Sequence, residues 1–170
     1  FGFILFVTLY VNAEIIGAFY LNSEISTIIK ILSYNFLILS FGSQFSILLN
    51  KYIDFKKLSI INIISSFSYF LSSVILLLNG YGIWSLVYSL ILKSIVQSVL
   101  LIIVGYNNKW LPRFEFSWKA ISKLVNFGFY HFLGRLVGKI HSRGDQLIIG
   151  KVLGASALGI YNISFQIVAQ

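Results

Sequence analysis

Three cationic or titratable side chains follow one another at a spacing of four inside an apolar stretch of the chain. They are His131, Arg135 and Lys139. Residues four apart lie nearly one above another on an α-helix, so these side chains form a stripe on one helix face. Guanidinium and ammonium groups bind phosphate oxygens, and Arg can do so through two parallel hydrogen bonds. The stripe therefore predicts a site for an anionic ligand.

A second polar stripe has the same spacing and consists of Ser85, Ser89, Lys93 and Gln97. Lys93 lies near the middle of its apolar segment, too deep for its ammonium group to reach the membrane surface easily. A lone Lys or Arg there costs about 2.5 to 3.5 kcal/mol. Both stripes should therefore face water or a counter-charge. The predicted ligand-binding residues are Arg135, Lys139, Lys93, His131 and Gln97.

The cations have an alternative explanation. Arg135 and Lys139 would be structural if they paired with Glu14 or Asp145, or if their helix lay at the membrane surface. Two carboxylates cannot neutralise these two cations and Lys93 together. This excess of positive charge favours an aqueous cavity with an anionic ligand. Lys30 lies close enough to a helix end to reach the interface, which favours a structural role.

The end of the first stripe carries further titratable groups. His141, Arg143 and Asp145 are candidates for coupling to an ion, a proton or sodium, or for an outer gate. A histidine can relay protons or serve only as a hydrogen-bonding group, and both roles stay open for His131 and His141. The chain has no cysteine and no His, Asp or Glu cluster with metal-ligand spacing. We therefore predict no metal and no cofactor.

Composition identifies the elements that position these groups. Hydrophobic residues make up 58% of the 170 residues and charged residues only 11%, with a mean hydropathy of +0.87, which indicates a membrane protein. Both ends of the chain fall within apolar runs, so we expect a piece of a longer polytopic protein. We predict an all-α membrane helix bundle, with spans at 1–19, 25–49, 58–79, 83–104, 121–141 and 155–170.

The loop charges predict the orientation of these spans. The segment 51–57 has three Lys against one Asp, and 105–123 has four basic residues against one Glu, so both should be cytoplasmic. The segment 105–120, which contains the single proline, is the predicted linker between residues 1–104 and residues 121–170. The net charge of +8 is dispersed among such breaks, a pattern that disfavours nucleic acid as a partner.

Several motifs resemble the polysaccharide (O-antigen) flippase family of the multidrug/oligosaccharidyl-lipid/polysaccharide exporter superfamily. The most specific is GDQLIIGKVLGASALGIYNISFQIV at 144–168, where an acidic residue precedes IIG and LGxxxLGxYN. KYIDFKKLSIINIISS, LNGYGIWSLV and LVNFGFYHFLG are similar to the middle region of the family. Where an Asn is expected from the family pattern, Arg143 and Gly144 stand instead. The resemblance covers essentially the whole chain.

The resemblance implies a two-lobed transporter of the cytoplasmic (inner) membrane, with two six-helix repeats around a central cavity. This chain would run from about the third helix into the eighth, with 1–104 ending the first lobe and 121–170 beginning the second. The implied substrate is an undecaprenyl-diphosphate-linked oligosaccharide, moved to the outer leaflet for polysaccharide or lipopolysaccharide biosynthesis. The implied partners are this lipid-linked diphosphate and the bilayer.

Three other functions are each disfavoured by the residues present. A multidrug antiporter of the same superfamily would need acidic residues in its cavity, whereas these spans offer cations. A membrane enzyme of glycan assembly would need paired carboxylates or an activated nucleophile, and Asp54, Glu115 and Asp145 stand alone in the sequence. A non-transporting scaffold leaves the cost of Lys93 and Arg135 in the membrane unexplained. We therefore expect a transporter rather than an enzyme.

Overall fold

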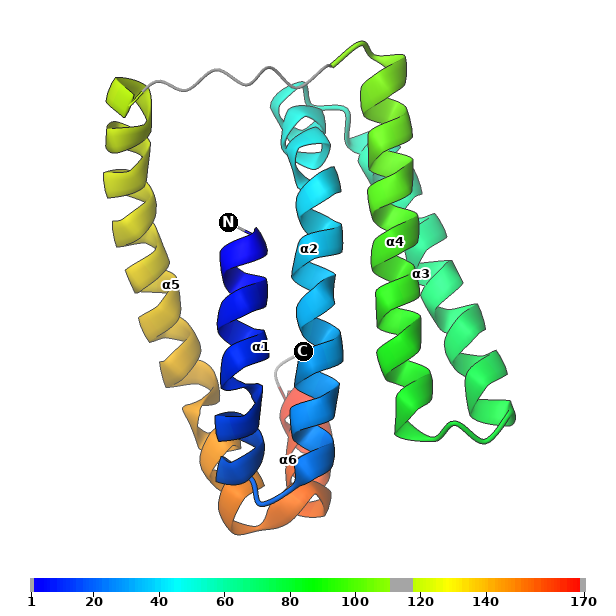
Figure 1. Ribbon diagram of the computed structural model, residues 1–170, viewed down its shortest axis with the longest axis vertical. Helices are drawn as coiled ribbons and strands as arrows, with labels where there is room; N and C mark the ends of the chain where they lie inside the picture. Colours follow the sequence, from blue (N-terminus) through cyan, green and yellow to red (C-terminus); the bar gives the residue numbers. More distant parts are fainter. Residues whose placement is uncertain (1, 111–117, 169–170) are drawn as a thin grey trace. The chain divides into compact units, whose positions relative to one another are not determined.

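The computed structural model describes residues 2–110 and 118–168, and all of its elements are helices (Figure 1). They are α1 (Gly2–Phe19), α2 (Ser23–Lys51), α3 (Phe55–Leu78), α4 (Ile83–Asn107), α5 (Trp118–Val152) and α6 (Gly154–Val168). The chain divides into two compact units, Phe1–Pro112 and Arg113–Gln170. Part of the predicted linker 105–120 lies outside the described residues; its beginning belongs to α4 and its end to α5.

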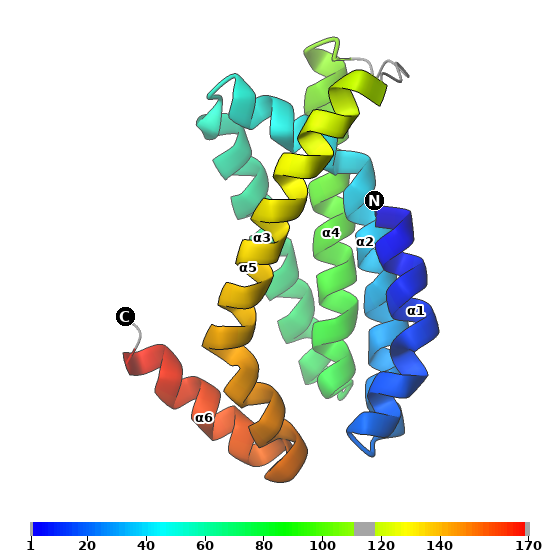
Figure 2. The same cartoon turned by 90° about the vertical axis from the view of Figure 1, so that its left-hand side faces the viewer.

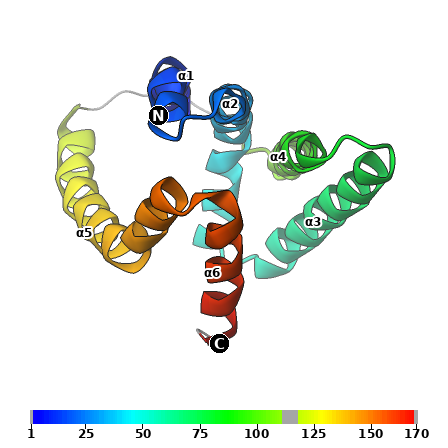
Figure 3. The same cartoon turned by 90° about the horizontal axis from the view of Figure 1, so that it is seen from below.

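The first unit is a bundle of four helices. Helix α2 packs against α1 and α4, and α4 packs against α3, so that the helices follow one another as α1, α2, α4, α3 (Figure 3). All four helices are long and apolar enough to cross a membrane. The predicted all-α polytopic membrane bundle is therefore confirmed.

Each of these four helices is followed by a tight turn that contains a residue of positive φ. These residues are Leu21, Ile53, Gly80 and Lys109, and the turn after α3 has a second one, Gly82. After α2, for example, the amide of Asp54 donates to the carbonyl of Leu49 at 3.0 Å, which closes the last turn. Asp54 then caps the start of α3 by accepting from the amide of Lys57 at 3.3 Å.

Small residues bring α2 and α4 into close contact. A Cβ atom on Gly42 would lie 2.9 Å from the Cα of Ser98, so the two backbones nearly touch there. The hydroxyl of Ser98 donates across the same contact to the carbonyl of Ile38 at 2.8 Å. A short distance along α4, the ring of Phe45 lies directly against Gly105. Close packing, rather than a large apolar core, therefore joins these helices.

The apolar core lies near the end of the unit at which α2 and α4 finish. Phe45 and Leu49 of α2 meet Ile61 of α3 and Leu101 of α4 there. Beside this cluster the rings of Tyr52 and Trp110 stack with their centroids 5.4 Å apart. This stacking places the turns after α2 and α4 next to each other, as expected if their basic residues share one side of the membrane.

The second unit is the helix pair α5 and α6, in which α6 turns back beside the end of α5 (Figure 2). The predicted spans 121–141 and 155–170 leave a loop at 142–154. In the structure most of this stretch is helical, because α5 continues to Val152 and α6 begins at Gly154. Charged residues and isolated glycines do not by themselves end a helix. The turn forms only at Gly154, where φ is +82°.

Six spans were expected, whereas the four helices of the first unit meet the length and hydropathy of a span among the described residues. Helix α6 has 15 residues within the described part of the chain. Helix α5 has 35 residues, but its charged stripe lowers its hydropathy. The charges of Arg135 and Lys139, each costly inside a membrane, account for this difference.

Candidate ligand-binding site

Lys93 lies close to the middle of α4, among the side chains that face α3. Its Nζ atom is 5.9 Å from the centre of the Tyr69 ring, a cation–π contact between the two helices. The side chain is only half-buried. Neither α3 nor α4 contains an acidic residue, so neither helix offers Lys93 an ion pair. Lys93 is therefore a mid-membrane cation held by an aromatic face, not by a carboxylate.

Gln97 lies one turn from Lys93 and also faces α3. Its Nε2 atom donates to Oδ1 of Asn62 at 3.2 Å. Gln97 is half-buried and Asn62 is exposed, so this amide pair lies at an open edge of the α3–α4 contact. Lys93 and Gln97, predicted from one stripe, thus lie on the same helix pair with partners from α3.

The serines of the same stripe have a different environment. Ser85 and Ser89 are 1% and 0% exposed, which places them inside helix contacts instead of on a water-facing surface. The expectation that the whole stripe faces water or a counter-charge is therefore wrong for these two residues. The reason is geometric, because a spacing of four drifts around a helix that has 3.6 residues per turn.

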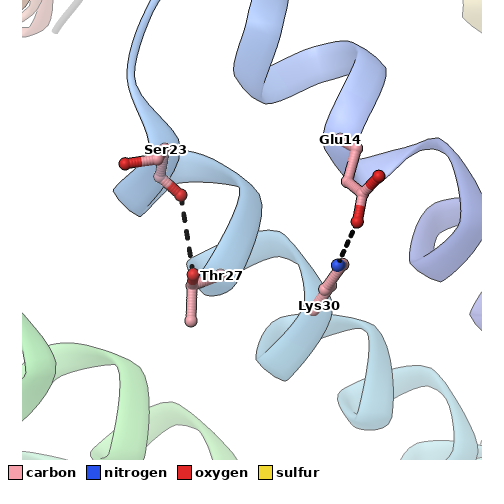
Figure 4. A network of polar contacts seen from close by, with 4 residues as sticks. All are labelled: Glu14, Ser23, Thr27 and Lys30. Atoms are coloured by element: carbon pink, nitrogen blue, oxygen red, sulfur yellow. Dashed lines mark hydrogen bonds and ion pairs between the residues drawn. The ribbon is translucent and has the colours of Figure 1, made fainter.

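Glu14 was one of the two carboxylates considered as partners for the stripe on α5. It pairs instead with Lys30, whose Nζ atom lies 2.7 Å from its Oε1 (Figure 4). The Lys30 ammonium also lies 5.9 Å from the centre of the Tyr10 ring. These contacts between α1 and α2 support the structural interpretation of Lys30.

Asp145 was the second candidate counter-charge. Its carboxylate accepts a hydrogen bond from the hydroxyl of Tyr161 in α6 and a second one, at 2.9 Å, from the amide of Gln146. Asp145 thus ties the end of α5 to α6. His141 and Arg143, the other candidate gate residues, lie exposed near the same end of α5.

The predicted stripe of cationic and titratable side chains lies on α5, as expected. His131, Arg135 and Lys139 are all exposed on this helix within the second unit. Among the described residues Arg135 makes no ion pair with a carboxylate. Its guanidinium therefore keeps its capacity for a bidentate contact with an anion.

The chemistry available at these positions is ligand binding. Ammonium, guanidinium and amide groups can hold an anionic and hydroxyl-rich molecule. The described part of the chain contains no group of three or more His, Cys, Asp or Glu side chains that could hold a metal ion.

Sequence reasoning missed Asn62, Tyr69 and Tyr161. A signal was present for the first two, because positions 62 and 69 are seven apart and share one face of α3 with Ser66. Tyr161 stands in the LGxYN motif, but nothing in its spacing shows that its hydroxyl reaches Asp145.

Comparisons with known proteins agree with these features. Residues 1–170 match the family described as "Polysaccharide biosynthesis protein". The chain is 36% identical to the teichuronic acid biosynthesis protein TuaB of Bacillus subtilis over 98% of its own length and 34% of the relative. It is 24% identical to the lipopolysaccharide biosynthesis protein WzxC of Escherichia coli, with the same coverage of both chains.

A third relative is named as a transport protein. The chain is 27% identical to the succinoglycan biosynthesis transport protein ExoT of Rhizobium meliloti over 91% of its own length and 31% of the relative. The chain thus spans about a third of the length of these relatives. No solved structure matches it. The chain belongs to the family of polysaccharide biosynthesis proteins, and this membership confirms the resemblance to polysaccharide flippases that its motifs show.

Proposed function

We propose that this chain is part of a flippase that moves an undecaprenyl-diphosphate-linked oligosaccharide from the inner to the outer leaflet of the cytoplasmic membrane. The relatives named for polysaccharide biosynthesis and transport support this proposal. The transported molecule combines a lipid, two phosphates and sugars. A binding site for it must offer cations and hydrogen-bonding groups at membrane depth.

The observation that carries the proposal is Lys93. It lies in the middle of a spanning helix, and its own helix and α3 contain no carboxylate. A cation in this position is costly unless water or an anion compensates it. A diphosphate supplies two negative charges, which compensate the positive charge of Lys93. Arg135, exposed on α5, is the second cation assigned to the diphosphate, with Lys139, His131 and Gln97 as further ligand contacts.

Transport requires that the site open alternately to the two sides of the membrane. In this proposal residues 1–104 and 121–170 belong to two lobes that move against each other. Asp145, with Arg143 and His141, acts near the outer gate or in coupling to a proton or sodium ion. The protein transports its ligand and forms or breaks no covalent bond in it.

The test is a measurement of glycan export in cells that produce the complete protein. Lys93→Gln and Arg135→Gln should each reduce export at least tenfold, because each removes a charge from the diphosphate site. Lys93→Arg should retain most of the export, and Lys109→Gln, in the turn after α4, serves as the matched control. Undiminished export by Lys93→Gln and Arg135→Gln, at wild-type protein levels, would remove the support for this site.

A further inference from the structure

Helix α3 has a polar face that the transporter site described so far does not use. Asn62, Ser66, Tyr69 and Ser73 follow at intervals of four, three and four residues, which keeps them on one side of a helix. Two of them contact α4: Asn62 accepts a hydrogen bond from Gln97, and the ring of Tyr69 contacts the Lys93 ammonium. The two helices therefore share a polar seam within the depth of the membrane.

This seam keeps unused hydrogen-bonding capacity. The contact between Gln97 and Asn62 consumes one N–H donor of Gln97 and one acceptor site of Asn62. The two N–H groups of Asn62 and the carbonyl of Gln97 remain for another partner. Asn62 is exposed, so these groups are accessible. In a hydrocarbon environment, such groups would be costly unless they met water or a polar ligand.

Tyr69 contributes an aromatic face to the same seam. Its ring contacts the Lys93 ammonium and is half-buried. Lys93 and Gln97 are four residues apart on α4, which corresponds to roughly 6 Å along the helix. On α3, Asn62 and Tyr69 are seven residues apart, which corresponds to about two turns or roughly 10 Å. The cation, the aromatic ring and the amide pair thus occur within about two helical turns.

We propose that this seam is a sugar-binding subsite, formed by Asn62 and Tyr69 of α3 with Gln97 of α4. It binds the sugar next to the diphosphate while Lys93 contacts the diphosphate itself. The amides exchange hydrogen bonds with sugar hydroxyls, and the Tyr69 ring covers an apolar face of the sugar ring. This assignment rests on the proposed function, and it adds residues of α3 that recognise the glycan rather than the lipid or its phosphates.

The experiment compares two ligands on the complete purified protein in nanodiscs. One is undecaprenyl diphosphate without sugar, and the other is the same lipid diphosphate carrying the repeat unit of the host. Asn62→Leu and Tyr69→Leu should each weaken binding of the sugar-bearing ligand roughly tenfold, about the effect of losing one well-placed polar contact. Binding of the sugar-free ligand should not change in Asn62→Leu, which also shows that this variant is folded. Tyr69→Leu also removes the ring beside the Lys93 ammonium, so it should weaken the sugar-free ligand too, but less than the sugar-bearing one.

Matched controls lie outside the seam. Asn12→Leu removes an amide from α1 that donates to the carbonyl of Thr8 in the same helix, and Tyr10→Leu removes the ring over Lys30. Both should leave the ratio of the two affinities unchanged. Lys93→Gln should weaken both ligands. Tyr69→Phe, which keeps the ring, should bind the sugar-bearing ligand better than Tyr69→Leu.

The outcomes separate the two proposals. If the wild-type protein binds neither ligand, the proposed function fails and this subsite fails with it. If it binds both ligands but Asn62→Leu and Tyr69→Leu bind them as the wild type does, the subsite alone is overturned. Equal weakening of both ligands in these variants would also overturn it, because the seam would then not distinguish the sugar.

Discussion

The hydroxyl of Tyr161 in α6 donates a hydrogen bond to the carboxylate of Asp145 in α5. Asp145 belongs to the GDQLIIG motif and Tyr161 to the LGIYN motif, so this contact connects the two motifs across the turn at Gly154. A carboxylate accepts stronger hydrogen bonds than a neutral oxygen does. The contact therefore links α6 to the end of α5 across this turn.

Tyr161→Phe removes this hydrogen bond without changing the shape of the ring. We expect a lower melting temperature of the complete protein in detergent and reduced export. Asp145→Asn should have a smaller effect, because the amide oxygen still accepts from Tyr161. Tyr130→Phe, at an exposed position of α5, is the control. A melting temperature unchanged by Tyr161→Phe would show that the hydrogen bond does not hold the two helices.

Close helix contact in the first unit predicts opposite effects for two glycine substitutions. Gly42→Ala should destabilise the protein by about 1 to 3 kcal/mol, because its Cβ would meet backbone of α4 that cannot move aside. Gly128→Ala has open space around its Cβ and should stabilise α5 by up to about 1 kcal/mol. Thermal unfolding of both variants measures the difference, and a shift of the same sign in both would contradict this packing.

The turn after α2 contains strain that a substitution can relieve. Ile53 adopts a φ of +57°, a conformation that β-branched residues avoid. Ile53→Gly should therefore raise the free energy of unfolding by about 1 kcal/mol. Gly80→Ala, at a φ of +82° in the turn after α3, should lower it by a similar amount. Loss of stability in Ile53→Gly would show that the Ile53 side chain stabilises the turn by more than its backbone strain.

Asp54, at the start of α3, predicts an acid-sensitive turn. The hydrogen bond from the Lys57 side chain holds the pKa of the Asp54 carboxyl below its usual value of 3.8. Because the pKa is lowered in the folded state, this stabilisation is fully present above pH 4 and is lost as the pH falls through the lowered pKa. Hydrogen exchange of the amides at the start of α3 between pH 7 and pH 3 measures this loss.

Asp54→Asn is the matched variant for the acid effect. Asparagine caps a helix about as well as aspartate does but does not titrate. In the variant, hydrogen exchange of the amides at the start of α3 should therefore not show the acid-dependent step. An identical pH dependence in wild type and variant would assign the step to another group.

Because Lys30 and Glu14 form an ion pair, exchanging their charges should restore the stability that a single substitution removes. Lys30→Glu alone places two carboxylates side by side between α1 and α2 and should lower both the melting temperature and the amount of folded protein. Glu14→Lys together with Lys30→Glu restores opposite charges at 2.7 Å spacing and should recover most of the loss. A double variant no more stable than its single parents would refute a direct pairing.

Helix type and the first four spans could be predicted because long apolar runs leave a membrane chain few alternatives. The turn at Gly80 and Gly82 was also readable from glycine spacing. The end of α5 could not be predicted in this way. Low hydropathy at the charged residues 143 and 145 indicates a loop, yet these residues continue the helix. Turn geometry at Gly154 decides that boundary, and it depends on a single backbone angle.

The charged residues of the candidate site could be predicted from the sequence. The residues of α3 that contact the polar residues of α4 could not. Lys93 stands out in any apolar helix because burial of its charge is costly. Asn62 and Tyr69 are ordinary residues on α3 until the antiparallel register of α3 and α4 brings them to Gln97 and Lys93. Register depends on packing between helices, which a pattern along one helix does not contain.

In the proposed function, the cations of α4 and those of α5 are accessible to water and bind an anionic, lipid-linked ligand. Single cysteines at positions 93, 97, 135 and 139, in an otherwise cysteine-free complete protein, test it by reaction with a water-soluble thiol reagent. We expect labelling at all four positions and protection by accumulated lipid-linked glycan. Positions that stay unlabelled, or that label equally with and without the glycan, would contradict it.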